Sequence, residues 1–314
     1  QKLRIFDKGV DALIISKSLS VFIDFKPLNW DILREINESK FSTISSKYNL
    51  SKLFRELCVN MCIEGGDGHI PSSFSLIEII TFLYKKKLNI NNKNLKNPNR
   101  DIFILSKGHG CLALYVNLYL KKFITRKDIF EFCKKDGILG EHPDTTKIKG
   151  VEACTGSLGH GLSFGAGIAL GKKIQKQKGK VYVVVGDGEC HEGTVWETAN
   201  IAKNFKLNNL VYFIDWNQSA MQLLPHDKMV DKWKSFGWHT QLINGHSYMQ
   251  LEKAIKKVES LQKTSTSPSV IVCKTIKGKG TKILEGHGKW HHKIPNELEY
   301  TEILKQIKNY NYDR

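Results

Sequence analysis

Short apolar runs alternate with longer amphipathic stretches along most of this chain. The runs Ile102–Leu105, Val181–Val185 and Leu210–Ile214 are almost entirely apolar, as expected of strands that are buried on both faces of a parallel sheet. Two further strands are predicted at Trp238–Ile243 and Ser269–Thr275. Strands that alternate with helices favour an α/β fold, with a doubly wound, mostly parallel sheet and helices on both of its faces.

Apolar residues at helical spacing fill the segments between these strands. The predicted helices are Leu112–Leu120, Leu158–Leu170, Gly193–Phe205 and Met249–Lys263. From Lys52 to Tyr84 the helical pattern is interrupted by the glycine-rich stretch Gly65–His69, which predicts a helix, a loop and a second helix. Residues 1–50 are weakly patterned, so we interpret them as an N-terminal extension and assign residues 51–314 to the main domain.

The composition is that of a globular protein with a basic surface. Hydrophobic residues make up 41% and charged residues 25% of the 314 residues, which excludes global disorder and a small disulfide-stapled module. Lys and Arg number 48 against 31 Asp and Glu, but only six are Arg. Because nucleic-acid readers rely on Arg for bidentate contacts, we expect a solvated basic surface and no nucleic-acid partner. Such a surface would attract an anionic substrate or an acidic partner chain.

The cysteines and the apolar stretches indicate the cellular compartment of the protein. The seven cysteines include no CxxC pair and mostly lie in apolar segments, so they are predicted to be reduced, with Cys190 packed in the core. No stretch has the roughly 20 apolar residues that span a bilayer, and no signal pattern opens the chain. We expect a cytoplasmic protein without membrane contact. Because the sequence begins with Gln1 and not with Met, the question of whether a leader was removed stays open.

Polar residues follow two predicted strands at the point where each strand ends. Asp187 lies between Gly186 and Gly188 after one strand, and Asn217 follows the next strand 30 residues later. Ligands of open parallel sheets bind at the carboxyl ends of the strands. A carboxylate and an amide oxygen from neighbouring strand ends form half of a cage for Mg²⁺ or Ca²⁺, which would hold a diphosphate.

The span from Gly186 to Asn217 resembles the thiamine-diphosphate motif, and four further segments are similar to those of the transketolase family. These are Gly68-His69-Ile70, Ser106-Lys107-Gly108-His109, His142-Pro143-Asp144 with Thr155–Gly161, and Thr275–Gly280 with Trp290-His291. Their order and spacing agree over about residues 50–300. The resemblance implies the thiamine-diphosphate-binding fold.

The resemblance also implies a role for each matching residue. Asp187, Asn217 and the backbone carbonyl of Ser219 would bind Mg²⁺, with Ca²⁺ or Mn²⁺ as alternatives. The implied cofactor-binding residues are His109, Gly156, Ser157, Leu158, Gly186, Asp187, Gly188, Glu189, Asn217 and His291. The implied catalytic residues are His69, His109, His142 and His291, of which His69 and His142 would face the donor sugar. Glu192 would couple paired active sites at a subunit contact.

For a transketolase-like enzyme, the implied reaction moves a two-carbon ketol unit from a ketose donor to an aldehyde acceptor through thiamine diphosphate. The chain is about half as long as a full transketolase. We therefore expect the N-terminal subunit of a split transketolase, active with a C-terminal partner subunit that supplies the pyrimidine-binding half. The expected assembly is a heterotetramer of two chains of each kind, acting on a sugar phosphate or a related small molecule.

Several alternatives stay open. The α subunit of a 2-oxoacid-decarboxylating thiamine enzyme shares Gly-Asp-Gly but lacks the His142-Pro143-Asp144 block. A degenerate subunit that binds the cofactor only for assembly would not need every metal ligand. The sequence departs from the transketolase family pattern at Ile70–Ser73, Ser157 and His160. These departures keep open a specialised transketolase that acts on a non-standard sugar. Ligand spacing gives no zinc site, and His292 is interpreted as surface polarity.

Overall fold

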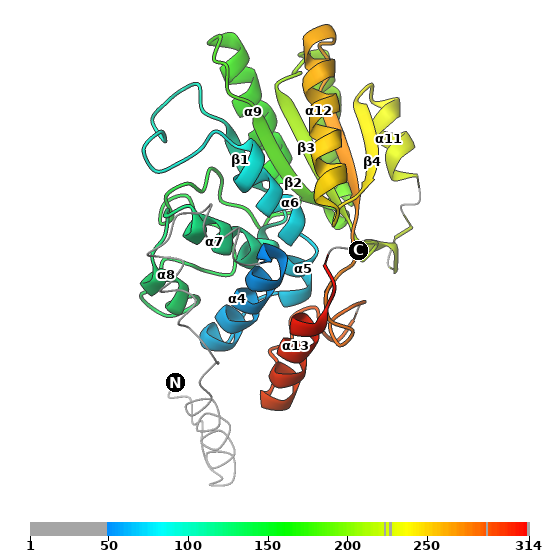
Figure 1. Cartoon of the computed structure of the whole chain (residues 1–314). Helices are drawn as coiled ribbons and strands as arrows, with labels where there is room; N and C mark the ends of the chain where they lie inside the picture. Colours follow the sequence, from blue (N-terminus) through cyan, green and yellow to red (C-terminus); the bar gives the residue numbers. More distant parts are fainter. Residues whose placement is uncertain (1–48, 223, 226–227, 287, 313–314) are drawn as a thin grey trace, which may run out of the picture.

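Five parallel strands form one sheet in the order β1-β2-β3-β5-β4 (Figure 1). The computed structural model describes residues 49–222, 224–225, 228–286 and 288–312. The strands are β1 Ile102–Leu105, β2 Val181–Gly186, β3 Leu210–Trp216, β4 His239–Asn244 and β5 Ser269–Lys274. The predicted doubly wound α/β fold is confirmed.

Helices cover both faces of this sheet. One face packs against α9 His160–Ile174, α10 Gly193–Asn204 and α11 Met229–Ser235. The other packs against α4 Leu50–Gly65, α6 Ile77–Phe82, α7 Cys111–Leu120 and α12 Tyr248–Thr264. The remaining α-helices of the described residues are α5 Ile70–Phe74, α8 Arg126–Phe130 and α13 Glu297–Asn309.

Strand β2 shows why the apolar runs are continuous. Val181, Val183 and Val185 belong to the core on the α9 side. Tyr182 and Val184 belong to the separate core on the α4 and α7 side. Successive side chains of a strand point to opposite faces, so a strand between two helical layers needs apolar residues at every position.

The structure shifts some predicted boundaries. Asp215 and Trp216 lie beyond the predicted strand Leu210–Ile214, but they are the last two residues of β3, and both are buried. Helix α9 begins at His160 rather than Leu158 because Gly159 has φ +81°, a left-handed conformation outside the helix. Helices α11 and α13 were not predicted, since their apolar patterns are short and lie between polar loops.

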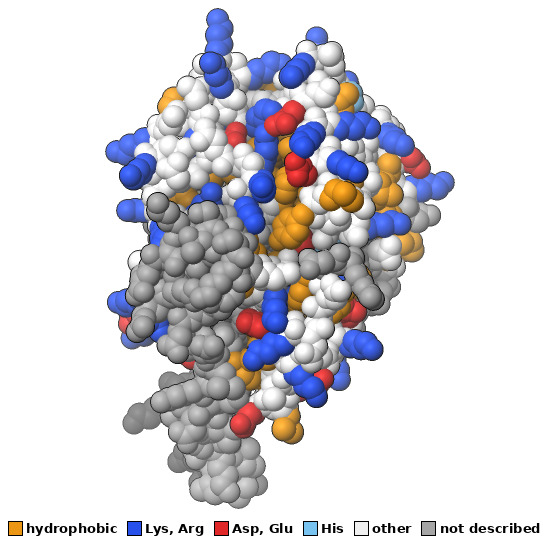
Figure 2. Space-filling model, viewed as in Figure 1, with side chains coloured by type: hydrophobic (Ala, Val, Ile, Leu, Met, Phe, Trp, Pro, Cys, Tyr) orange, Lys and Arg blue, Asp and Glu red, His pale blue; other side chains and the backbone are white. Residues whose placement is uncertain are grey.

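The predicted extension over residues 1–50 lies outside the described residues except for Asn49 and Leu50. The Asn49 side chain accepts a hydrogen bond from the Lys52 amide and caps α4. All seven cysteines are free, and Cys190 is buried. No helix in the described part of the chain combines the length and the apolar character that a membrane span requires. Lys and Arg side chains are spread among Asp and Glu on the face seen in Figure 2.

A buried ion pair joins α4 to α6. Arg55 Nη1 lies 2.6 Å from Glu78 Oε1, and Nη2 lies 3.0 Å from Oε2. His246 Nδ1 donates to Glu78 Oε2 over 2.8 Å, because its Nε2 accepts the Ile276 amide. Arg55 also donates to the Lys279 and Phe74 carbonyls. The pair therefore ties the helical layer to the segment after β5.

Glu78→Ala is expected to lower the free energy of unfolding by about 3–5 kcal/mol, because it leaves the Arg55 charge buried without its partner. Lys256→Ala is the matched control: it removes an exposed α12 pair to Glu252 and should cost less than about 1 kcal/mol. Urea unfolding of the two variants measures both values. Similar small losses in both would contradict the structural role of the buried pair.

The cost of Glu78→Ala should also depend on pH. Burial alone would raise the pKa of Glu78, but the Arg55 charge and the hydrogen bonds from His246 and Arg55 outweigh it and hold the pKa well below its usual range. A depressed carboxyl pKa stabilises the fold above the unfolded value of about 4.3 and loses that contribution as pH falls. The difference between wild type and variant should thus shrink below about pH 4, and a constant difference from pH 7 to about pH 3 would contradict this.

Candidate active site

A cavity of about 480 Å³ opens at the carboxyl ends of β1, β2 and β3. The four histidines predicted to be catalytic, His69, His109, His142 and His291, all line it. Its wall also contains these predicted residues: Leu158, Gly186, Asp187, Gly188, Glu189, Asn217 and Ser219. Parallel strands end at the same edge of the sheet, which is why residues more than 200 positions apart meet here.

Asp187 and Asn217 form the candidate metal site. Both are buried, and they follow neighbouring strands. Asp187 Oδ1 accepts the Gly188 amide over 2.9 Å, whereas Oδ2 is buried without a hydrogen-bond partner. Burial, with the nearby Asp215 charge, raises the pKa of Asp187 to about 6. A divalent cation would satisfy the unpaired oxygen, so the residues present fit a metal.

A buried ion pair beneath this site fixes the two strand ends. Lys107 Nζ, just after β1, lies 2.7 Å from Asp215 Oδ2 in β3. The same oxygen accepts hydrogen bonds from Ser75 Oγ at 2.7 Å and Asn217 Nδ2 at 3.2 Å, and Thr275 Oγ1 donates to Oδ1. Because the Asn217 amide nitrogen is held by Asp215, its oxygen is directed to the Ser219 amide and the metal site.

Burial keeps two histidines of the cavity neutral. Burial, followed by the charge of Lys107, lowers the pKa of His109 to about 2. Burial, followed by the charge of His291, lowers the pKa of His69 to about 3. The rings of His69, His109 and His291 lie 5.0–5.8 Å apart between centroids. Neutral imidazoles offer one donor and one acceptor each, which suits contacts to phosphate and sugar oxygens.

Lys277 lies in the motif Thr275–Gly280, but the sequence alone predicts no role for it. Its side chain is buried, and Nζ donates to Ser219 Oγ and His291 Nδ1, each over 2.9 Å. Because His291 Nδ1 accepts this hydrogen bond, the proton of the neutral imidazole lies on Nε2. Burial and the Lys107 charge lower the pKa of Lys277 to about 8. The cavity thus places an ammonium group and an imidazole donor where an anion such as a diphosphate would bind.

The other predicted residues shape the wall or lie beside it. Glu189 is buried, and its carboxylate accepts hydrogen bonds from Ser106 Oγ and from the Gly159 and Gly186 amides. Gly156 supports His142, since an added Cβ would lie 2.8 Å from His142 Cδ2.

Three predicted residues, Gly156, Ser157 and Glu192, are not part of the cavity lining. Ser157 is exposed, with Oγ 3.1 Å from His160 Nδ1. Glu192 is exposed and is the N-cap residue of α10. Its predicted role at a subunit contact stays a prediction.

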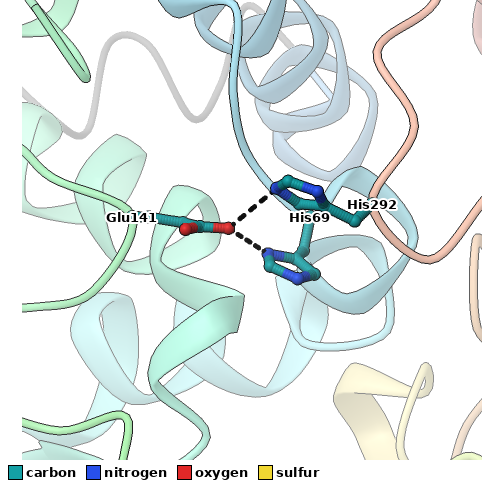
Figure 3. Close-up of side chains that lie close together, drawn as sticks. All are labelled: His69, Glu141 and His292. Carbon is teal, nitrogen blue, oxygen red and sulfur yellow. Dashed lines mark ion pairs between the residues drawn. The ribbon is translucent and has the colours of Figure 1, made fainter. Parts of the chain in front are cut away.

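A second cluster at the cavity was not predicted. Glu141 Oε1 lies 3.0 Å from both His69 Nδ1 and His292 Nε2. Figure 3 draws both contacts as dashed lines. Asp67 Oδ1 lies 2.8 Å from His292 Nε2. The interpretation of His292 as mere surface polarity therefore misses a specific contact. Linear spacing concealed it, because the three segments are about 70 to 225 residues apart.

The family model described as "Transketolase, thiamine diphosphate binding domain" matches residues 46–313. The chain is 36% identical over 258 residues to a subunit of the apulose-4-phosphate transketolase of Phocaeicola vulgatus, covering 81% of this chain and 90% of that one. It is 34% identical over 254 residues to the 6-deoxy-6-sulfo-D-fructose transketolase subunit SqwG of Clostridium sp., covering 79% and 91%.

Solved transketolases share the fold over part of their length. The transketolase of Campylobacter jejuni superposes with a TM-score of 0.75 at 27% identity, over 91% of this chain and 44% of that one. The transketolase of Leishmania mexicana gives a TM-score of 0.74 at 23% identity, over 84% and 42%. The chain thus spans less than half of these solved chains but most of the subunit relatives. It belongs to the transketolase family and corresponds to the family's thiamine-diphosphate-binding domain.

Proposed function

We propose that this chain is the thiamine-diphosphate-binding subunit of a two-subunit transketolase, which transfers a two-carbon ketol unit from a ketose to an aldehyde acceptor. The observation that carries the proposal is the unpaired Asp187 Oδ2, buried beside Asn217 at a cavity with Lys277 and four histidines. This set can hold a divalent metal and a diphosphate together. The α subunit of a decarboxylating enzyme is not favoured, because the subunit relatives are named transketolases.

Each group has a proposed task. Asp187, Asn217 and the Ser219 carbonyl bind Mg²⁺, while His109, His291 and the Gly188 amide donate to the diphosphate. When bound, thiamine diphosphate supplies the carbanion chemistry that breaks and forms the carbon–carbon bond. His69 and His142 face the sugar, where a neutral imidazole can donate to a developing oxyanion or hold a proton. Lys277 adds positive charge and fixes the His291 tautomer.

The named relatives support the proposed partner and substrate class. The Phocaeicola relative is named as one subunit of its transketolase, and this chain covers 90% of it, which supports a second subunit that completes the active site. The relatives are named for a sugar phosphate and a sulfo sugar. The formal charge of +17 on this chain supports an anionic sugar derivative as its substrate. We expect two chains of each kind per complex, with Glu192 at the contact between paired sites.

Asp187→Asn is expected to weaken Mg²⁺-dependent binding of thiamine diphosphate by at least about 100-fold, because it removes the charged metal ligand. Asp231→Asn is the control, since Asp231 is an exposed residue of α11 and should leave the affinity unchanged. Calorimetric titration with thiamine diphosphate, with and without Mg²⁺, measures both variants. Equal affinity for wild type and Asp187→Asn would refute the metal assignment.

Transfer activity should require a second subunit. The chain alone is expected to bind the cofactor weakly, whereas a mixture with a C-terminal transketolase subunit should bind it tightly and transfer a ketol unit from a ketose phosphate to an aldose phosphate. The measurements are calorimetry and a coupled transfer assay on the chain, the partner and the mixture. Full turnover by the chain alone would overturn the split-enzyme proposal, and absence of cofactor binding in the mixture would leave a degenerate subunit.

A further inference from the structure

Three loop residues converge on one point at the wall of the cavity: His69 before α5, Glu141 in the segment after α8, and His292 before α13. We call them the His–Glu–His cluster. One nitrogen of each histidine and one carboxylate oxygen lie within 4.8 Å of one another (Figure 3). None of these three residues is among the ligands proposed for the magnesium site, which are Asp187, Asn217 and Ser219.

An ion pair alone does not account for the cluster. Glu141 Oε1 lies 3.0 Å from His292 Nε2 and 3.0 Å from His69 Nδ1. His69 Nδ1 is buried without a hydrogen-bond partner of suitable geometry. His69 Nδ1 and Glu141 Oε1 therefore face each other without a hydrogen bond of suitable geometry, and a cation between them would satisfy both atoms.

We propose that His69, Glu141 and His292 form a second metal site, which binds a divalent transition metal ion of the Zn²⁺ or Co²⁺ class. Metal–ligand bonds of about 2.1 Å separate two ligand atoms by about 3.0 Å at right angles and about 3.4 Å in a tetrahedron. Both Glu141 contacts have the first of these separations. Two histidines and one carboxylate on one side of the ion leave further coordination positions open.

The surroundings hold the three donors in place and offer a fourth. The Glu141 carbonyl accepts a hydrogen bond from Cys111 Sγ over 3.0 Å, and the His69 carbonyl accepts the Ser73 amide over 3.1 Å. Asp67 Oδ1 lies 2.8 Å from His292 Nε2, within reach of an ion bound there. His69 and Glu141 both line the cavity, so the open positions can take water or an oxygen of a molecule bound in it.

The two metal sites would select different ions. The site at Asp187 and Asn217 offers only oxygen ligands, which suit Mg²⁺ or Ca²⁺. The His–Glu–His cluster offers two imidazole nitrogens and one carboxylate, which favour Zn²⁺, Co²⁺ or Ni²⁺ over Mg²⁺. A saturating concentration of Mg²⁺ should therefore fill the first site and leave the second free for a transition metal.

Co²⁺ is the probe, because its visible absorption reports nitrogen ligands directly. The chelator-treated full chain, held in excess Mg²⁺, is titrated with Co²⁺ and then with Zn²⁺. We expect one equivalent of Co²⁺ to bind with a visible band that Zn²⁺ abolishes. His292→Ala and Glu141→Gln should each weaken Co²⁺ binding at least about tenfold. Glu141→Gln keeps the size of the side chain, so its effect does not depend on a loss of folding.

Two control variants separate this site from other metal binding. His239→Ala removes a half-buried histidine of β4 that is bonded to Ser265, and it should leave the Co²⁺ affinity unchanged. Asp187→Asn should likewise leave it unchanged while weakening the binding of Mg²⁺ and thiamine diphosphate. The proposal is overturned if no saturable band appears, if His292→Ala binds as wild type does, or if Asp187→Asn alone removes the band.

Discussion

The buried ion pair between Lys107 and Asp215 is the interaction on which the site depends. It joins the end of β1 to the end of β3 across β2, and both side chains are buried. Such a pair is stable only when its remaining hydrogen-bonding capacity is also met, and Ser75, Asn217 and Thr275 meet it on the Asp215 side. The same network orients the Asn217 amide. The geometry of the proposed metal ligands is therefore set by charges that do not themselves touch the metal.

The charge balance of the cavity explains which ligand it accepts. Burial keeps His69 and His109 neutral, while Lys107 and Lys277 bring two ammonium groups close to Asp187. Lys107 is compensated by Asp215, but Lys277 donates to a hydroxyl and an imidazole. An anion with several oxygens would pair with the Lys277 ammonium group, and an accompanying divalent cation would pair with the Asp187 carboxylate. A metal–diphosphate pair has that character, in agreement with the family to which the chain belongs.

The wall that would face a sugar differs from the floor that would hold the diphosphate. Glu141 lies 3.0 Å from both His69 and His292, and Asp67 lies 2.8 Å from His292. These residues lie in loops rather than at strand ends. Loops tolerate substitution more readily than the ends of buried strands, so substrate recognition can change there while the strand-end residues keep the cofactor in place. The named relatives, which include subunits for apulose-4-phosphate and 6-deoxy-6-sulfo-D-fructose, show that members of this family serve different sugars.

The sequence by itself determined the sheet, its strands and the residues at the strand ends, because continuous apolar runs and the Gly-Asp-Gly to Asn spacing are local signals. It placed Asp187, Asn217 and the four histidines, which the structure brings to one cavity. The predicted strand ended at Ile214 and left out Asp215, since a buried carboxylate in a strand is expected only once Lys107 is known to lie beside it. The tertiary structure alone decided the Asp215 network, the role of Lys277 and the His–Glu–His cluster. Each depends on contacts between side chains from segments far apart in the chain, and the spacing of residues along the sequence does not indicate which of them meet in space.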